Sequence, residues 1–296
     1  MTLTWRHVAR KDFEDAVRSR LLWGLTATFV GLMSLFLVIL VAVEGDSVPP
    51  LEGYIFLGSW SQFFVPLIAL IVGYMAIVGE RRSGSLRMLL SYPFSRESVV
   101  LGKVIGRTAV VTITILVGFA VVSAIVMAVL GVPDLIDALV VIGVTAVLGL
   151  TFTAAAVGIS AGTSSRGTAM AIAVGLFFVL FILWEAVAIG LYYAVNGTRP
   201  GLVVDSWYLF IRQLNPIEAY RATLSSISGQ FVWPIANLGL EDIPMEAAAD
   251  DRMVAERVDG NKPFYLHPWF SGVVYAIWIV VPVTLGYLRF RGTDLE

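Results

Sequence analysis

The sequence predicts an all-α membrane protein with six transmembrane helices, an N-terminal interfacial amphipathic helix and an external helical segment between spans five and six. Of the 296 residues, 58% are hydrophobic and only 14% are charged, whereas soluble domains carry about 25% charged residues. Six apolar stretches each exceed the length of about 20 residues that a bilayer crossing requires. Because nothing in the composition divides the chain, we expect one transmembrane domain over residues 1–296.

Composition also excludes several classes of function. The net charge of −2 supplies no basic surface for nucleic acid. The chain has no cysteine, which excludes disulfides, thiolate metal sites and cysteine nucleophiles. A phosphate-binding P-loop needs Lys followed by Ser or Thr, and no lysine here is followed by either. The two histidines, His7 and His267, cannot form an HExxH zinc motif. We therefore expect no catalytic, cofactor or metal site in this chain.

The N-terminal segment 4–20 has the spacing of an amphipathic helix. One polar stripe contains His7, Lys11, Glu14 and Arg18, which are three or four residues apart. Apolar side chains fall on the other side of the helix. A basic amphipathic helix ahead of a span typically lies in the membrane interface. We place this helix there.

Hydropathy then sets the spans and their connections. The fourth span is rich in Gly, Ala and Thr, which allow helices to approach closely in lipid. The second and third spans flank a charged segment, 80–107, which we interpret as a cytoplasmic loop. A long polar segment, 194–267, precedes the last span. The expected spans are about 21–43, 54–79, 108–131, 138–160, 169–193 and 268–288.

The distribution of basic residues predicts the orientation in a cell membrane. The N-terminal segment, residues 80–107, the connection 161–168 and the C-terminal tail together hold 14 of the 20 Lys and Arg residues. The two short connections on the other side hold none. Short cytoplasmic loops are enriched in Lys and Arg, whereas long segments such as 194–267 translocate largely regardless of charge. Both termini and residues 80–107 are therefore expected in the cytoplasm.

The external segment contains a helix start. Asn215 suits an N-cap, Pro216 suits the first turn, and Glu218 is placed to reach back to the cap. The helix that follows has amphipathic spacing, which favours a surface helix lying on the outer ends of the spans. A lid over a transport path is the functional alternative.

Glu185 is the one acidic residue inside an expected span. An ionisable group in a span costs a few kcal/mol or more, so it indicates function by default. It either lines a transport path, where it binds a cationic or hydrogen-bonding group, or fixes the packing of a neighbouring helix. The sequence does not decide between these interpretations.

The segment 80–103 carries the strongest pattern in the chain. Its basic residues lie between two uncharged stretches, 54–79 and 108–133. The ordered residues Glu80-Arg81-Arg82-Ser83-Gly84-Ser85-Leu86, Leu89-Leu90-Ser91-Tyr92-Pro93, Ser95-Arg96 and Leu101-Gly102-Lys103 resemble the signature of ABC-2 type transporter permeases. The six-span layout matches this family over the whole chain. The external residues 214–221 also resemble the NosY branch, the permeases of nitrous-oxide reductase maturation.

The resemblance implies that this segment couples the chain to a separate cytoplasmic ATPase, which would use ATP and Mg. In the family a short helix after the second span sits in a groove of the ATPase. The residues suit this role because leucines offer an apolar face, arginines can pair with acids, and Ser95 can cap the following helix. Basic residues that only set topology are the alternative interpretation. The residues implied in coupling are Glu80, Arg81, Arg82, Gly84, Leu86, Leu89, Leu90, Pro93, Arg96 and Lys103.

The resemblance further implies the permease subunit of an ATP-driven transporter that works as a homodimer in the lipid bilayer, with export as the direction. In the NosY-like branch, the cargo would serve the maturation of a metalloenzyme outside the membrane. A membrane subunit that uses ATPase strokes to act on envelope proteins or lipids, without transport, is the alternative. A secondary carrier is a third possibility, and the scarcity of charge in the spans argues against it.

Overall fold

The computed structural model describes residues 5–45, 48–83, 94–228, 257–258 and 262–292. Within these ranges every regular element is helical, and six helices are long and apolar enough to cross a membrane. The predicted all-α fold with six spans is therefore confirmed. The elements are α1 (Trp5–Val17), α2 (Arg20–Glu44), α3 (Pro50–Gly73), α4 (Val78–Ser83), α6 (Arg96–Val129), α7 (Leu135–Gly162), α8 (Arg166–Phe178), η2 (Val179–Leu183), α9 (Trp184–Asn196), α10 (Ser206–Gln213), α11 (Pro216–Ser228), η4 (Phe264–Leu266) and α12 (Phe270–Arg291).

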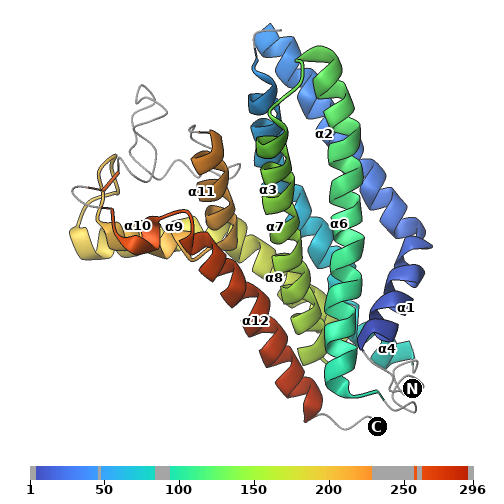
Figure 1. Cartoon of the computed structure of the whole chain (residues 1–296). Helices are drawn as coiled ribbons and strands as arrows, with labels where there is room; N and C mark the ends of the chain where they lie inside the picture. Colours follow the sequence, from blue (N-terminus) through green and yellow to red (C-terminus); the bar gives the residue numbers. More distant parts are fainter. Residues whose placement is uncertain (1–4, 46–47, 84–93, 229–256, 259–261, 293–296) are drawn as a thin grey trace.

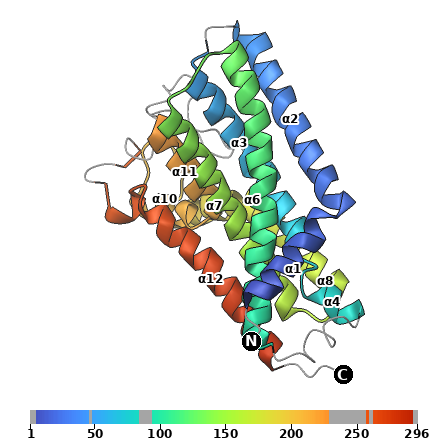
Figure 2. The ribbon, with the colours of Figure 1, turned by 45° about the vertical axis from the view of Figure 1, so that its right-hand side comes forward.

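Helix α7 is the centre of the bundle, because it packs against α3, α6 and α12. Helices α2, α3, α6 and α7 run alongside one another, and α12 slants across α7 (Figures 1 and 2). The largest apolar cluster of buried side chains is shared by these long helices and includes Phe29, Phe152 and Leu148. The lipid-facing sides of the helices keep large apolar side chains exposed, as expected for a protein whose solvent is a bilayer.

Helix α6 begins at the predicted cap, before the span expected from about 108. It starts at Arg96, with the Ser95 hydroxyl accepting a hydrogen bond from the Ser98 amide at 3.1 Å. The expected cap is therefore present. Its 34 residues give a length of about 50 Å, which exceeds a hydrocarbon core of about 30 Å. One end of α6 therefore extends beyond the apolar layer, and that end carries Lys103 and Arg107.

The second span also ends differently from the prediction. Helix α3 stops at Gly73, and a short turn leads into the separate helix α4. Residues 80–107 are therefore not a continuous loop, because both α4 and the first turns of α6 are helical. Hydropathy missed these helical ends because their charged residues lower the local average.

The fifth span changes its winding halfway along. Residues Val179–Leu183 form a π-helix between α8 and α9. A π-helix shifts the hydrogen-bond partner from the fourth to the fifth residue and changes the pairing of nearby carbonyls. Here the Asn215 side-chain amide donates to the Leu180 carbonyl oxygen at 2.5 Å. The residue that precedes α11 is thus joined to the π-helix of the fifth span.

Helix α11, which was expected on the surface of the spans' outer ends, is built into the bundle. It packs against α3, α7 and α12, and Figure 1 shows it standing beside the upper half of the bundle. The Tyr220 hydroxyl donates to the Gly58 carbonyl oxygen at 3.0 Å and lies 2.8 Å from the Thr145 hydroxyl oxygen. These contacts replace the predicted surface helix with one that is buried between three spans.

The start of α11 confirms one part of the predicted cap and corrects another. Asn215 Oδ1 accepts a hydrogen bond from the Ile217 amide at 2.9 Å, as an N-cap does. The backbone amide of Asn215, however, donates to the Arg212 carbonyl oxygen at 3.0 Å. The Glu218 carboxylate faces Arg212 and Arg221. Two arginines are close enough to hold this carboxylate, so it does not close a capping box.

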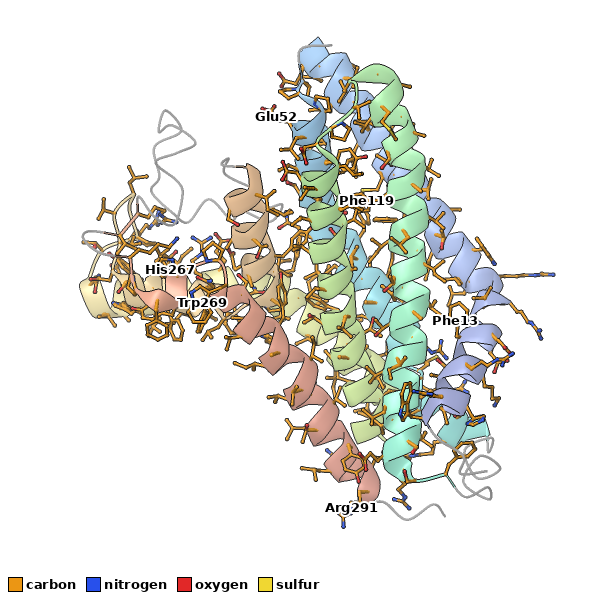
Figure 3. All side chains as sticks on the ribbon, viewed as in Figure 1. Phe13, Glu52, Phe119, His267, Trp269 and Arg291 are labelled. Carbon is orange, nitrogen blue, oxygen red and sulfur yellow. The ribbon has the colours of Figure 1, made fainter. Side chains whose placement is uncertain are left out.

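Helix α1, helix α4 and the C-terminal end of α12 share one end of the bundle (Figure 1). Figure 3 shows Phe13 of α1 and Arg291 of α12 towards this end, with Glu52 of α3 at the opposite end. The predicted coupling residues that the structure describes lie at this shared end.

Candidate coupling site

Helix α4 is held against the end of α7. The Ser160 hydroxyl oxygen accepts hydrogen bonds from the Ile77 and Val78 amides, both at 3.0 Å. It therefore satisfies donors at the start of α4 that have no partner within the helix. Arg81 Nη1 donates to the Thr163 carbonyl oxygen at 3.1 Å, and Thr163 ends α7. Helix α4, which carries the first residues of the predicted motif, is thus fixed to the bundle at both ends.

Arg96 joins the start of α6 to the end of α12. Its Nη1 donates to the Phe290 carbonyl oxygen at 2.6 Å and to the Arg291 carbonyl oxygen at 2.9 Å. The last carbonyls of a helix lack partners within it, and a guanidinium satisfies them well. The buried Phe290 ring lies between two cations, with Arg81 Cζ at 5.6 Å and Arg96 Cζ at 5.4 Å from its centroid. Two of the arginines predicted to face a partner are therefore engaged within the chain.

Lys103 is the centre of a buried group of charges, the Lys103 cluster, formed by Asp12, Glu80, Lys103 and Arg107. Lys103 Nζ lies 2.6 Å from Asp12 Oδ1 and 2.5 Å from Glu80 Oε1. Arg107 Nε lies 2.8 Å from Asp12 Oδ2. Only 4% of the Lys103 side chain and 2% of the Asp12 side chain are exposed. The cluster connects α1, α4 and α6.

The geometry of the Lys103 cluster makes its members interdependent. Removing one partner of a buried ion pair typically costs about 3–5 kcal/mol, because the remaining charge is left without compensation. Asp12 is protected against this by two cations, Lys103 and Arg107. Lys103 in turn is shared between two carboxylates. The predicted coupling residues Glu80 and Lys103 are therefore paired inside the chain.

The remaining predicted coupling residues divide between described and undescribed parts of the chain. Arg82 belongs to α4. The segment 84–93 lies outside the described residues. It contains Gly84, Leu86, Leu89, Leu90 and Pro93. Arg81 and Arg96, which the structure describes on either side of this segment, make the contacts given above.

Three residues of this site were missed by the sequence interpretation: Asp12, Arg107 and Phe290. A local signal existed for Asp12, because it lies on the apolar side of an otherwise amphipathic helix, where an acid is unexpected. For Phe290 no local pattern distinguishes it from other aromatic residues near span ends. Phe290 contacts Arg81 and Arg96 because α12 ends beside α4 and α6.

Helix α1 sits in a groove of α6 that has no side chains at its base. A Cβ atom added to Gly102 would lie 2.6 Å from Val8 Cβ, and one added to Gly106 would lie 2.9 Å from the Ala9 carbonyl oxygen. Glycines four residues apart on one helix allow such backbone approach. The apolar side of α1, predicted to face lipid, therefore packs on α6 through Val8, Ala9 and Ala16.

Ser160 stands in a Gly-x-Ser-x-Gly pattern at residues 158–162. In hydrolases this pattern presents the serine on a sharp strand-to-helix turn. Here the serine is in the helix α7, is fully buried, and accepts the two amide hydrogen bonds described above. The pattern is structural in this chain. Among the described residues, no group of three or more metal-ligating side chains comes together.

Glu185 belongs to a second buried group of charges, which joins the fifth span to α10 and α11. Its Oε1 lies 3.7 Å from Arg212 Nη2, and the exposed fractions of the two side chains are 8% and 10%. Arg212 also faces Glu218 at 3.5 Å, and Glu218 pairs with Arg221. These contacts link α9, α10 and α11, which favours the packing interpretation. A role of Glu185 in a transport path stays a prediction.

Comparison with known proteins agrees with this architecture. The model of a family described as ABC-2 family transporter protein matches residues 6–295. A protein of Pseudomonas aeruginosa named "Probable ABC transporter permease protein NosY" is 30% identical over 262 residues, covering 84% of this chain and 91% of the relative. A protein of Stutzerimonas stutzeri with the same name is 31% identical over 270 residues, with the same shares covered.

The family match spans nearly every described element, from α1 to the end of α12. It includes the ends of α4 and α6 that flank residues 84–93, where the sequence pattern places the family signature. The six apolar helices are long enough to cross a membrane, as expected for a multi-pass membrane protein. The chain therefore belongs to the ABC-2 family of transporters, as a multi-pass permease subunit.

Proposed function

We propose that this permease couples to a separate cytoplasmic ATPase through residues 84–93 and their two flanking helices, α4 and α6. ATP binding, with Mg, would close the ATPase subunits and push this segment. Because α4 and α6 are tied to α7, α12 and α1, the push would be passed to these helices. Export is the direction that the family resemblance implies.

The observation that carries this proposal is the anchoring of both ends of the segment. Arg81 bonds the C-terminal end of α7, and Arg96 bonds the C-terminal end of α12. Lys103 ties the same corner to α1. A segment that only set topology would need positive charge at the membrane end. It would not need these specific bonds to the ends of two spans.

We further propose a homodimer of permeases with two ATPase subunits. One chain supplies six spans and one coupling segment, so a second copy would provide the second docking position for a paired ATPase. The similarity to relatives named NosY favours, for this chain, the cargo expected for the NosY-like branch, which would serve the maturation of a metalloenzyme outside the membrane. Because the ATPase is cytoplasmic, α4 and the two termini at the same end of the bundle would face the cytoplasm.

A capture experiment tests the coupling. The detergent-solubilised chain is purified from its own host, bound proteins are identified, and ATPase activity and complex mass are measured. We expect a P-loop ATPase to be retained, in a complex of two permeases and two ATPases. Replacing Leu89 and Leu90 with aspartate removes the proposed apolar contact. This variant should insert in the membrane but lose the ATPase.

The matched control is Val132→Asp/Leu135→Asp, which introduces the same two charges at exposed positions where α6 leads into α7, away from α4. It should retain the ATPase. Retention of the ATPase by the Leu89 and Leu90 variant would overturn the docking proposal. If the chain alone moves solute in liposomes without ATP, the secondary-carrier interpretation replaces it.

A further inference from the structure

The Lys103 cluster joins two parts of the molecule that are otherwise packed in different ways. Helix α1 lies in the Gly102–Gly106 groove of α6 with backbone and side-chain atoms in close contact. Helix α4 packs instead against α8 and bonds to α7 through Arg81 and Ser160. The ion pair between Lys103 and Glu80 joins α4 to the α1–α6 unit.

Lys103 makes two contacts in the cluster, one with Asp12 of α1 and one with Glu80 of α4. The two contacts differ in how many cations surround the carboxylate. Asp12 has two cationic partners, Lys103 and Arg107. It therefore remains compensated by Arg107 if Lys103 is lost. The arm to Glu80 depends on Lys103 itself, at 2.5 Å. The α1–α6 contact can thus be kept while the connection to α4 is cut.

We propose that the Lys103–Glu80 ion pair is a positioning joint that makes α1 and α6 follow α4 when the coupling segment is displaced. This inference rests on the proposed function and deepens it by assigning Lys103 an internal role in place of a contact with the ATPase. Helix α1, which is followed by α2 after two residues, then moves together with α4 and α6.

The physical reason is the cost of separating buried charges. Little of Lys103 is exposed, and charges attract each other more strongly where water is excluded. Moving α4 away from α6 would break this pair and take one of its two carboxylates from the buried Lys103 ammonium, so α6 moves with it. The lysine stem has several rotatable bonds and keeps its ammonium on a carboxylate through modest changes of angle. The joint therefore holds distance while it permits tilt.

The test removes both charges of the joint together. The double variant Glu80→Gln/Lys103→Met deletes one acid and one base and leaves the Asp12–Arg107 pair in place. The matched control is Arg10→Gln/Glu14→Gln, which deletes one acid and one base from α1. The Arg10–Glu14 pair is on the surface, with 83% and 49% of its side chains exposed. There Arg10 lowers the pKa of Glu14 by a hydrogen bond and by charge attraction.

Retention of the ATPase is measured on the complex in liposomes. The ATPase activity is then measured with and without the permease, and the ratio of the two gives the stimulation by the permease. For Glu80→Gln/Lys103→Met we expect unchanged retention and stimulation lowered by about tenfold, within the range typical of coupling between sites. The control should keep both. Lys103→Arg, which retains the charge, should keep most of the stimulation.

The outcomes are distinguishable. Retained ATPase with unaltered stimulation in the double variant overturns the joint while leaving the docking proposal intact. If the unaltered chain itself captures no ATPase, the proposed function fails and this inference fails with it. Should the double variant not insert, Glu80→Gln alone decides, because it removes the ion pair with Lys103 while Lys103 keeps its contact with Asp12. Stimulation by Glu80→Gln equal to that of the unaltered chain would overturn the joint.

Discussion

Asn215 shows how one side chain can serve two elements at once. Its Oδ1 caps α11 by accepting from the Ile217 amide, and its Nδ2 donates to the Leu180 carbonyl oxygen in the π-helix of the fifth span. An amide is suited to this because it carries both an acceptor and donors. The residue therefore fixes where α11 begins and holds the bend of the fifth span against it.

Removing the Asn215 amide should lower stability in two separable steps. Asn215→Ala loses the cap and leaves a buried carbonyl without its donor, so we expect the free energy of unfolding to fall by about 2–3 kcal/mol. Asn215→Ser keeps a capping oxygen but loses the bond to Leu180, so about half of that loss should remain. Denaturant titration in detergent measures both.

The comparison variant is Ser165→Ala, which removes the cap of α8, where the Ser165 hydroxyl accepts from the Thr168 amide at 3.0 Å. It should cost about 1 kcal/mol, the value of a cap alone. If Asn215→Ser is as stable as the unaltered chain, the bond to the π-helix contributes no stability.

At the scale of elements, the contact between α1 and α6 depends on the absence of side chains at Gly102 and Gly106. Gly106→Ala would place a methyl group 2.9 Å from the Ala9 carbonyl oxygen and 3.1 Å from Asp12 Cβ. Since a backbone atom cannot move aside alone, α1 must shift, at a cost of about 1–3 kcal/mol. We expect trypsin to cut α1 at the exposed Arg10 and Lys11 about tenfold faster.

Gly24→Ala is the control for that cleavage measurement. Gly24 lies in α2 and has no neighbouring atom within 4 Å of an added Cβ. Alanine favours a helix over glycine by about 1 kcal/mol, so this variant should be cleaved no faster than the unaltered chain. Equal cleavage of Gly106→Ala and Gly24→Ala would show that α1 does not depend on the groove.

The elements differ in how far the sequence could predict them. The six spans follow from apolar length, and the start of α6 was indicated by Ser95 as a cap. Hydropathy alone places this span only from about 108, because charged residues end a hydropathy segment even when the helix continues through them. The Lys103–Asp12 pair joins residues 91 positions apart. No local pattern encodes such a partner, although an acid on the apolar side of α1 was a sign that one exists.

At the scale of the whole molecule, the orientation in the membrane is a prediction that the chain makes simple to test. It contains no cysteine, so a single introduced cysteine is the sole target of a membrane-impermeant maleimide. Val132→Cys and Glu97→Cys change exposed residues near opposite ends of α6. We expect position 132 to be labelled on intact cells and position 97 only after permeabilisation. Labelling of position 97 on intact cells would reverse the proposed orientation.

The distance along the chain between Asp12 and Lys103 sets an order of events during synthesis. Helix α1 leaves the ribosome first, and its partner helix follows 91 residues later. At about 5–20 residues per second, Asp12 waits roughly 5–20 s before Lys103 is made. Throughout that interval the helix has an acid on its apolar side and no groove to occupy. Helix α1 therefore takes its final place only after α6 has been inserted, so a helix that is made before α6 settles after it.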